Sequence, residues 1–142
     1  MEIGQKGLAL IKSFEKCYLE PYDDGYGYKT IGWGLVILKT DHFTTLTQQE
    51  ADALLLRDLT SAEHVVDSVV SVPLSQSQYD ALVSFQFNTG HLPKSTLLMD
   101  LNKGNIKAAS EQFHLWIHSS GKVSRGLIRR RDAEEALFNA KS

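Results

Sequence analysis

The sequence is poor in cysteine, in long apolar runs and in excess charge of either sign. Cys17 is the only cysteine among 142 residues, so no disulfide forms within the chain and folding needs no oxidising compartment. The N-terminal residues 1–6 contain no long apolar run, which argues against a secretory signal or a membrane anchor. The formal net charge is −2, so we expect no overall attraction to nucleic acid or to anionic lipid.

The chain does contain enough apolar sequence for one folded domain. Apolar residues make up 42% and charged residues 23%, both close to the averages for soluble globular proteins. The length suits one domain with a core rather than two. Cys17 is expected to pack as a small apolar residue.

Helix signals surround one short β-rich segment. Two capping-box sequences, Thr47–Glu50 and Ser75–Gln78, predict helix starts, Gly90 predicts a helix end, and Pro73 interrupts the apolar pattern. The expected helices span residues 4–15, 47–70, 75–90, 94–102, 105–118 and 124–139. Glycines alternating with aromatic and β-branched residues over 17–38 predict a small twisted β-hairpin region.

These elements predict an α+β architecture of two lobes joined by a long helix. A small N-terminal β-hairpin lobe is expected over about residues 14–60. A larger all-helical lobe is expected over about 61–142, together with the first helix. A cleft between two lobes is a usual place for a ligand.

A carboxyl group at the end of the first expected helix is the best clue to chemistry. Glu15 follows Phe14 at a helix C-terminus, where desolvation and the helix dipole both disfavour an anion and so raise a pKa. Asp24 lies in a turn sequence, where a carboxylate stays ionised, and Thr30 lies beyond it. An acid that stays protonated beside an ionised carboxylate suits cleavage of glycosidic bonds.

The local pattern alone leaves two plainer readings open. A glutamate at a helix end is often simply exposed, and Asp-Gly is common turn chemistry. Asp23 competes with Asp24 on chemistry alone.

His114 and His118 could share a helix face four residues apart, but a zinc site needs further ligands, so no metal is expected.

The chain resembles the phage-type lysozymes, glycoside hydrolase family 24. The signature is carried by Phe14-Glu15, Tyr22, Asp24, Gly27 and the run Thr30–Gly34, and the similarity continues through residues 81–90, 95–104, Trp116 and 126–138. The resemblance covers nearly the whole chain, and its most specific part is the spacing of the glutamate, aspartate and threonine. Only Asp24 has that spacing, so the resemblance favours Asp24 over Asp23.

The resemblance implies a muramidase that needs no cofactor. Glu15 would be the general acid, with Asp24 and Thr30 together positioning the attacking water or stabilising the transition state. The bond cleaved would be the β-1,4 linkage between N-acetylmuramic acid and N-acetylglucosamine in peptidoglycan, with the inversion that is assigned to the family. Phe87 and Asn88 match positions that face the cleft, although a buried phenylalanine is equally expected at 87.

Three further features extend or qualify this picture. Thr96 is a weaker substrate-binding candidate and a stronger helix-start residue. The basic run Arg125, Arg129, Arg130 and Arg131 is expected to form a solvated face paired with Asp132, Glu134 and Glu135; the alternative is that one arginine reaches Glu15 or a peptide carboxylate of the wall. Leu35 stands where the family usually has a histidine. The ion pair of that histidine with a helix-borne acid is therefore absent, which bears on local stability and its pH dependence rather than on catalysis.

The expected setting is bacterial lysis. The protein would be made in the host cytoplasm as a monomer and released onto the cell wall by a partner such as a holin or a secretion machinery, without stable membrane insertion. The same muramidase could serve as an antibacterial effector, and the chain could be part of a larger carrier. A non-catalytic wall-binding module and a transglycosylase are the rival functions.

Overall fold

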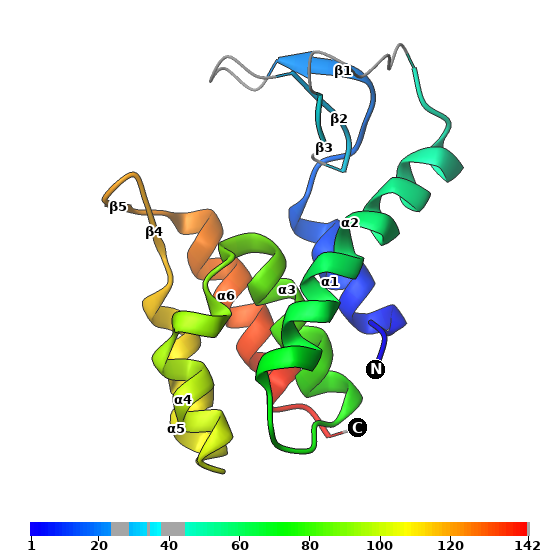
Figure 1. Cartoon of the computed structure of the whole chain (residues 1–142). Coiled ribbons are helices and arrows are strands. Elements are labelled where there is room, and N and C mark those ends of the chain that lie inside the picture. The colour runs from blue at the N-terminus through cyan, green and yellow to red at the C-terminus, as the bar shows by residue number, and fades with distance from the viewer. Residues whose placement is uncertain (24–28, 34, 38–44, 142) are drawn as a thin grey trace. The chain divides into compact units, whose positions relative to one another are not determined.

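The computed structural model describes residues 1–23, 29–33, 35–37 and 45–141, and over most of strands β1–β3 it describes the backbone alone (Figure 1). The chain forms two compact units. One comprises Lys12–Thr60, and the other comprises Met1–Ile11 with Ser61–Ser142. Asp24, Gly27 and Gly34 of the predicted signature fall outside the described residues.

The described elements confirm a mostly helical α+β fold. The helices are α1 (Gln5–Phe14), α2 (Gln48–Val69), α3 (Gln76–Thr89), α4 (Thr96–Asn102), α5 (Ile106–Gln112) and α6 (Arg125–Phe138), with 3₁₀ turns η1 (Leu92–Lys94) and η2 (Phe113–Leu115). The strands are β1 (Tyr18–Asp23), β2 (Lys29–Gly32), β3 (Leu35–Ile37), β4 (His118–Ser119) and β5 (Lys122–Val123). Within the described part of the chain, no helix is both long enough and apolar enough to cross a membrane.

The unit Lys12–Thr60 is built around a three-stranded antiparallel sheet in the order β1-β2-β3 (Figure 1). Strand β2 ends at Gly32, whose φ of +63° lies in the left-handed region that favours glycine. Gly32 lies against Leu46 and Ala51, which form a small apolar cluster. Cys17, Trp33 and Leu54 pack against this cluster. The prediction that Cys17 packs as a small apolar residue is confirmed.

Helix α2 begins at the predicted capping box and ends ahead of Pro73. The Glu50 amide donates to Thr47 Oγ1 at 3.1 Å, and the Thr47 amide donates to Glu50 Oε1 at 3.0 Å. Its apolar stripe is only partly buried: Leu55, Leu59 and Val66 have almost no exposure, whereas Leu54, Val65 and Val69 are half-buried.

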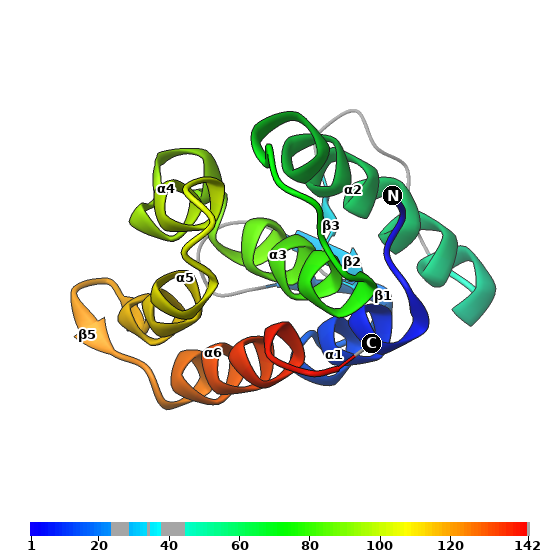
Figure 2. The same cartoon turned by 90° about the horizontal axis from the view of Figure 1, so that it is seen from below.

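Helix α3 forms the core of the other unit. Ser75 and Gln78 make the predicted capping box, and Gly90 closes the helix with φ of +69°. The residues from Tyr79 to Phe85 are all buried, and Figure 2 shows α3 lying between α6 and the C-terminal part of α2. A helix segment that is buried on every side belongs in the middle of a bundle.

The start of α1 is capped by a residue that is distant in the sequence. Asp80 on α3 is buried, and its carboxylate accepts from the Gly4 amide at 2.8 Å and the Gly7 amide at 3.1 Å. The first amides of a helix have no partner within the helix, so this carboxylate satisfies groups that are otherwise orphaned. A Cβ at Gly7 would lie 2.6 Å from Asp80 Cβ, so the approach of the two helices requires glycine at this position.

The prediction of an all-helical larger lobe, with a helix over 105–118, is wrong. Helix α5 ends at Gln112, η2 follows, and β4 and β5 form a two-stranded antiparallel hairpin. The hairpin turn places Ser120 at φ +51° and Gly121 at φ +78° between the paired residues Ser119 and Lys122. Two successive positive φ values make the type I′ turn that suits a two-residue hairpin loop, and no helix accommodates them.

Candidate active site and substrate pocket

The three predicted catalytic positions belong to the unit Lys12–Thr60. Glu15 is half-buried and directly follows the last residue of α1, as the sequence predicted. Thr30 lies in β2, where it pairs with Tyr22 of β1 and Val36 of β3, so its backbone is held from both sides. Asp24 lies outside the described residues, and its role stays a prediction.

The rival Asp23 is the last residue of β1 and pairs with Lys29. The turn sequence predicted at Asp24 lies outside the described residues. Leu35, at the position of the family histidine, begins β3 opposite Ile31.

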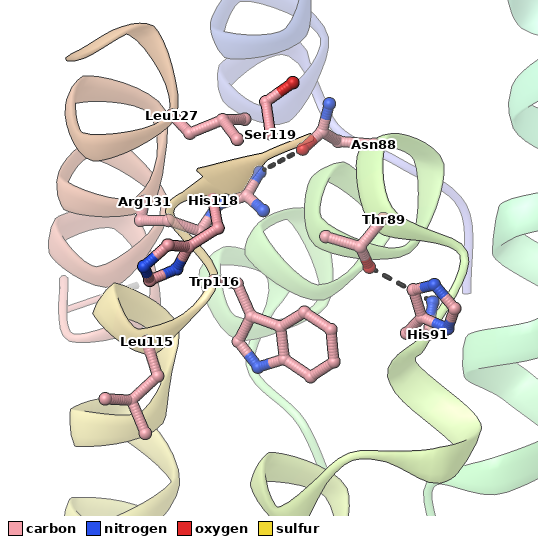
Figure 3. Close-up of a pocket in the computed structure, with 9 residues that line it drawn as sticks. All are labelled: Asn88, Thr89, His91, Leu115, Trp116, His118, Ser119, Leu127 and Arg131. Carbon is pink, nitrogen blue, oxygen red and sulfur yellow. Dashed lines mark hydrogen bonds between the residues drawn. The ribbon is translucent and has the colours of Figure 1, made fainter. Parts of the chain in front are cut away.

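The unit that comprises Met1–Ile11 and Ser61–Ser142 contains a cavity of about 580 Å³ (Figure 3). Asn88 lines it, whereas the other two predicted substrate-binding residues, Phe87 and Thr96, are absent from its lining. Thr96 is the first residue of α4, directly after the N-cap Ser95, which agrees with its alternative role as a helix-start residue. The lining residues are Asn88, Thr89, His91, Leu115, Trp116, His118, Ser119, Leu127 and Arg131.

An aromatic pair forms part of the cavity wall. Trp116 is half-buried and stacks on His91, with ring centroids 5.7 Å apart and planes inclined by 20°. The Phe85 ring also meets the Trp116 ring edge-on, with centroids 5.5 Å apart. Indole and imidazole faces suit the flat or apolar parts of a polar ligand. Trp116 entered the sequence resemblance only as a matching position, because a lone tryptophan does not distinguish a binding surface from a core.

Asn88 is held by a buried arginine. Arg131 has no exposed side-chain surface, and its Nη2 donates to Asn88 Oδ1 at 2.7 Å (Figure 3). The amide oxygen of Asn88 is therefore engaged, which leaves its Nδ2 as a donor beside the cavity. Among the described residues, Arg131 Nη1 has no hydrogen-bond partner.

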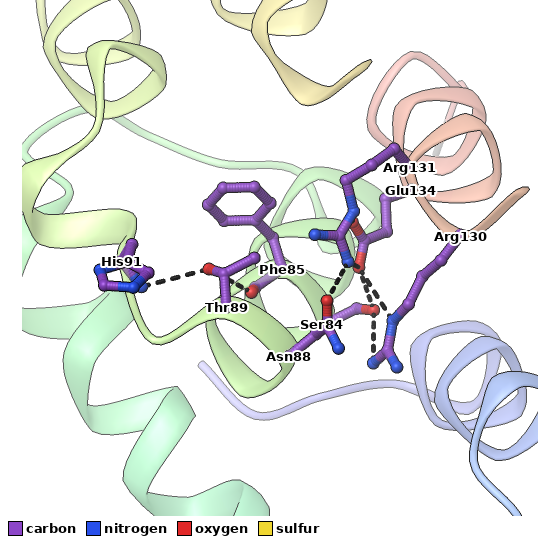
Figure 4. Close-up of polar contacts among 8 residues, drawn as sticks. All are labelled: Ser84, Phe85, Asn88, Thr89, His91, Arg130, Arg131 and Glu134. Atoms are coloured by element: carbon purple, nitrogen blue, oxygen red, sulfur yellow. Dashed lines mark hydrogen bonds and ion pairs between the residues drawn. The ribbon is translucent and has the colours of Figure 1, made fainter. Parts of the chain in front are cut away.

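The arginine is itself fixed by a buried carboxylate (Figure 4). Glu134 Oε1 lies 2.7 Å from Arg131 Nε, and Glu134 Oε2 lies 3.5 Å from Arg130 Nε and accepts from Ser84 Oγ at 2.5 Å. Burial raises the pKa of Glu134, while Arg131, Ser84 and Arg130 favour its ionised form. The guanidinium of Arg131 also lies over Phe85, 5.3 Å from the ring centroid.

This cluster overturns part of the prediction for the basic run. Arg125 and Arg129 are exposed, as predicted, but Arg130 and Arg131 are buried and share Glu134. The sequence pattern missed this because adjacent positions in a helix usually face different directions. Both side chains nevertheless reach the same buried acid one turn along the helix.

The two histidines considered as a metal pair do not share a helix. His114 lies in η2, and His118 lies in β4. Over the described ranges, no group of three or more histidine, cysteine, aspartate or glutamate side chains could hold a metal ion.

Comparison with known proteins identifies the family. The Phage lysozyme family model matches residues 12–134. The chain is 40% identical over 142 residues to the endolysin of Bacillus phage B103, covering 97% of this chain but only 54% of that protein. It is 39% identical over 145 residues to the endolysin of Salmonella phage P22, covering 97% of this chain and 98% of the relative.

The fold comparison agrees. The muramidase domain of SpmX from Asticaccaulis excentricus superposes with a TM-score of 0.88 at 34% identity, covering 99% of each chain. The family match, the two endolysin relatives and this shared fold all extend over nearly the whole chain. The chain therefore belongs to the phage lysozyme family, a family of lysozyme-type glycoside hydrolases.

Proposed function

We propose that this protein is a muramidase that hydrolyses the β-1,4 bond between N-acetylmuramic acid and N-acetylglucosamine in peptidoglycan and thereby lyses bacteria. The observation that supports this most strongly is the phage lysozyme match over residues 12–134, which spans Glu15, Asp24 and Thr30. A purely wall-binding module has no need for an acid, a second carboxylate and a hydroxyl at this spacing.

Glu15 is the general acid. It directly follows the C-terminal end of α1, and in this role its carboxyl group donates a proton to the leaving oxygen. Asp24 and Thr30 position the attacking water or stabilise the transition state. No cofactor takes part in this mechanism, because the acid and water supply the proton and the nucleophile.

Asn88 contacts the wall polymer through the cavity that it lines together with Trp116 and Arg131. Its oxygen is occupied by Arg131, so its Nδ2 donates to an acceptor such as an amide carbonyl. Peptidoglycan carries such groups on its N-acetyl sugars and on its peptides. Phe87 and Thr96 are weaker candidates, because neither lines this cavity.

The setting is the lysis of a host bacterium. The enzyme is made in the cytoplasm as a monomer, and a holin or a secretion machinery releases it onto the cell wall. An effector delivered against a competing bacterium would use the same chemistry.

A turbidity assay on purified bacterial walls tests the function. Wild-type protein should clear the suspension, and Glu15→Gln should bind walls without clearing them, because an amide does not protonate a leaving oxygen. Clearing by Glu15→Gln at the wild-type rate would show that Glu15 is not the acid. Glu111→Gln is a matched control, since Glu111 is an exposed glutamate in α5 of the other unit.

The products separate the remaining rivals. Hydrolysis leaves a reducing N-acetylmuramic acid end, and mass spectrometry should detect it. Products ending in 1,6-anhydro sugars would identify a transglycosylase instead. Wild-type protein that binds walls but releases no fragments would identify a binding module.

A further inference from the structure

One aspartate on α2 gathers side chains from three parts of the unit Lys12–Thr60. The Trp33 indole donates from Nε1 to Asp52 Oδ1 at 2.7 Å, and Gln48 Nε2 donates to the same oxygen at 2.9 Å. Lys12 Nζ lies 3.4 Å from Asp52 Oδ2 and 5.5 Å from the centroid of the Trp33 ring. Gln48 Nε2 also lies 3.7 Å from Cys17 Sγ. We name these five residues the Asp52 cluster.

The members of the Asp52 cluster flank the proposed catalytic residues in the sequence. Lys12 precedes Glu15 by three residues, and Cys17 follows it by two, so the cluster holds the chain on both sides of the acid. Trp33 follows Thr30 by three residues, directly after the end of β2. The cluster therefore links the segment that carries Glu15 to the strand that carries Thr30, with α2 as the common support.

The geometry around Trp33 makes this link a stiff one. Gly32 is buried against Leu46 and Ala51, where a Cβ would meet each of them at 3.6 Å. Packing against Leu46 and Ala51 thus restrains the backbone at Gly32. The hydrogen bond to the Asp52 carboxylate restrains the neighbouring Trp33 indole through its Nε1 atom. The hydrogen bonds from Trp33 and Gln48 lower the pKa of Asp52, and the bond from Trp33 has the larger effect. The Asp52 carboxylate therefore stays ionised in weakly acidic solution.

We propose that Asp52 and Trp33 are positioning residues of the muramidase, which set the separation between Glu15 and Thr30. The inference rests on the proposed function. Acid catalysis requires its groups within a few tenths of an ångström of the productive geometry, and a displacement of about 1 Å can lower the rate about 100-fold. Neither residue needs to touch the substrate to exert this effect.

Variants of the two residues test the proposal through a split between kcat and KM. Initial rates of reducing-end release are measured over a range of wall concentrations, at a temperature well below the melting point of every variant. Asp52→Leu and Trp33→Phe should each lower kcat about 10- to 100-fold and leave KM within about threefold. The double variant should lose no more than the worse single variant, because both changes break one link.

Two further variants serve as references. Asp58→Leu makes the same change on the same helix, at an aspartate of similar exposure that forms an ion pair with the surface residue Arg57, and should keep the wild-type kcat. Asp52→Asn retains an oxygen that accepts from Trp33, so it should recover most of the kcat that Asp52→Leu loses.

The outcomes are distinguishable. If Asp52→Leu and Trp33→Phe lower the melting point but leave kcat unchanged, the cluster only stabilises the fold and the proposal is overturned. A raised KM with an unchanged kcat would overturn it as well. If Asp52→Leu fails to fold, Trp33→Phe decides, because it removes the donor and keeps the ring beneath Lys12. Wild-type protein that releases no reducing ends would overturn the proposed function itself.

Discussion

Replacing Glu134 by glutamine removes one charge from the buried ion cluster of α6. Glu134 has no exposed surface and is the acid shared by Arg130 and Arg131, whose side chains are 4% and 0% exposed. Glutamine preserves the shape of the side chain, so packing changes little. It leaves two buried guanidinium groups without the carboxylate that compensates their charge.

The size of the effect follows from this burial. Breaking a buried ion pair from one side typically costs about 3–5 kcal/mol of the free energy of unfolding. The unfolding entropy of a chain of this length is about 0.3 kcal/mol per kelvin, so the expected fall in melting temperature is about 10–17 °C. Thermal unfolding followed by circular dichroism, with urea unfolding for the free energy, measures both quantities.

The neighbouring Glu135 provides a matched control. Its side chain is 28% exposed, lies 4.0 Å from His114 Nδ1, and accepts a long hydrogen bond of 3.4 Å from Ser110. Glu135→Gln should therefore cost less than about 1 kcal/mol. A Glu134→Gln variant as stable as Glu135→Gln would refute the conclusion that the buried cluster depends on this carboxylate.

Two other substitutions test packing and hydrogen bonding at the start of the chain. Gly7→Ala should lower the free energy of unfolding by about 1–3 kcal/mol in urea titrations, because the new Cβ would clash with Asp80, and an unchanged midpoint would contradict the close approach. Tyr79→Phe should cost about 1 kcal/mol at neutral pH, because it removes the 2.8 Å hydrogen bond to the Met1 carbonyl. Burial, together with Asp67, Glu63 and Asp80, raises the pKa of Tyr79, so its stabilising effect is complete below about pH 10 and is lost as the pH rises further. Tyr79→Phe should accordingly flatten the alkaline fall in melting temperature, and a parallel fall in both proteins would contradict this.

Local signals in the sequence predicted most helix boundaries correctly. The capping boxes at Thr47 and Ser75 and the C-cap at Gly90 form as expected, since their hydrogen bonds join residues only a few positions apart. The end of α1 just before Glu15 and the strand containing Thr30 were predictable for the same reason. The β4–β5 hairpin was missed because Ser120 adopts a left-handed conformation that glycine usually takes.

By itself, the sequence determined the family, the order of the helices and of the first β-rich segment, and the spacing of Glu15, Asp24 and Thr30, because these depend on local pattern and chain order. Tertiary structure alone decided that Arg131 is buried beside Glu134, that Asp80 caps a helix more than seventy residues away, and that Asp52 binds Trp33. Charged side chains look alike in a sequence whether water or a buried partner surrounds them. Only folding brings the distant partner within hydrogen-bonding distance and so decides which charged side chains hold other parts of the chain in place.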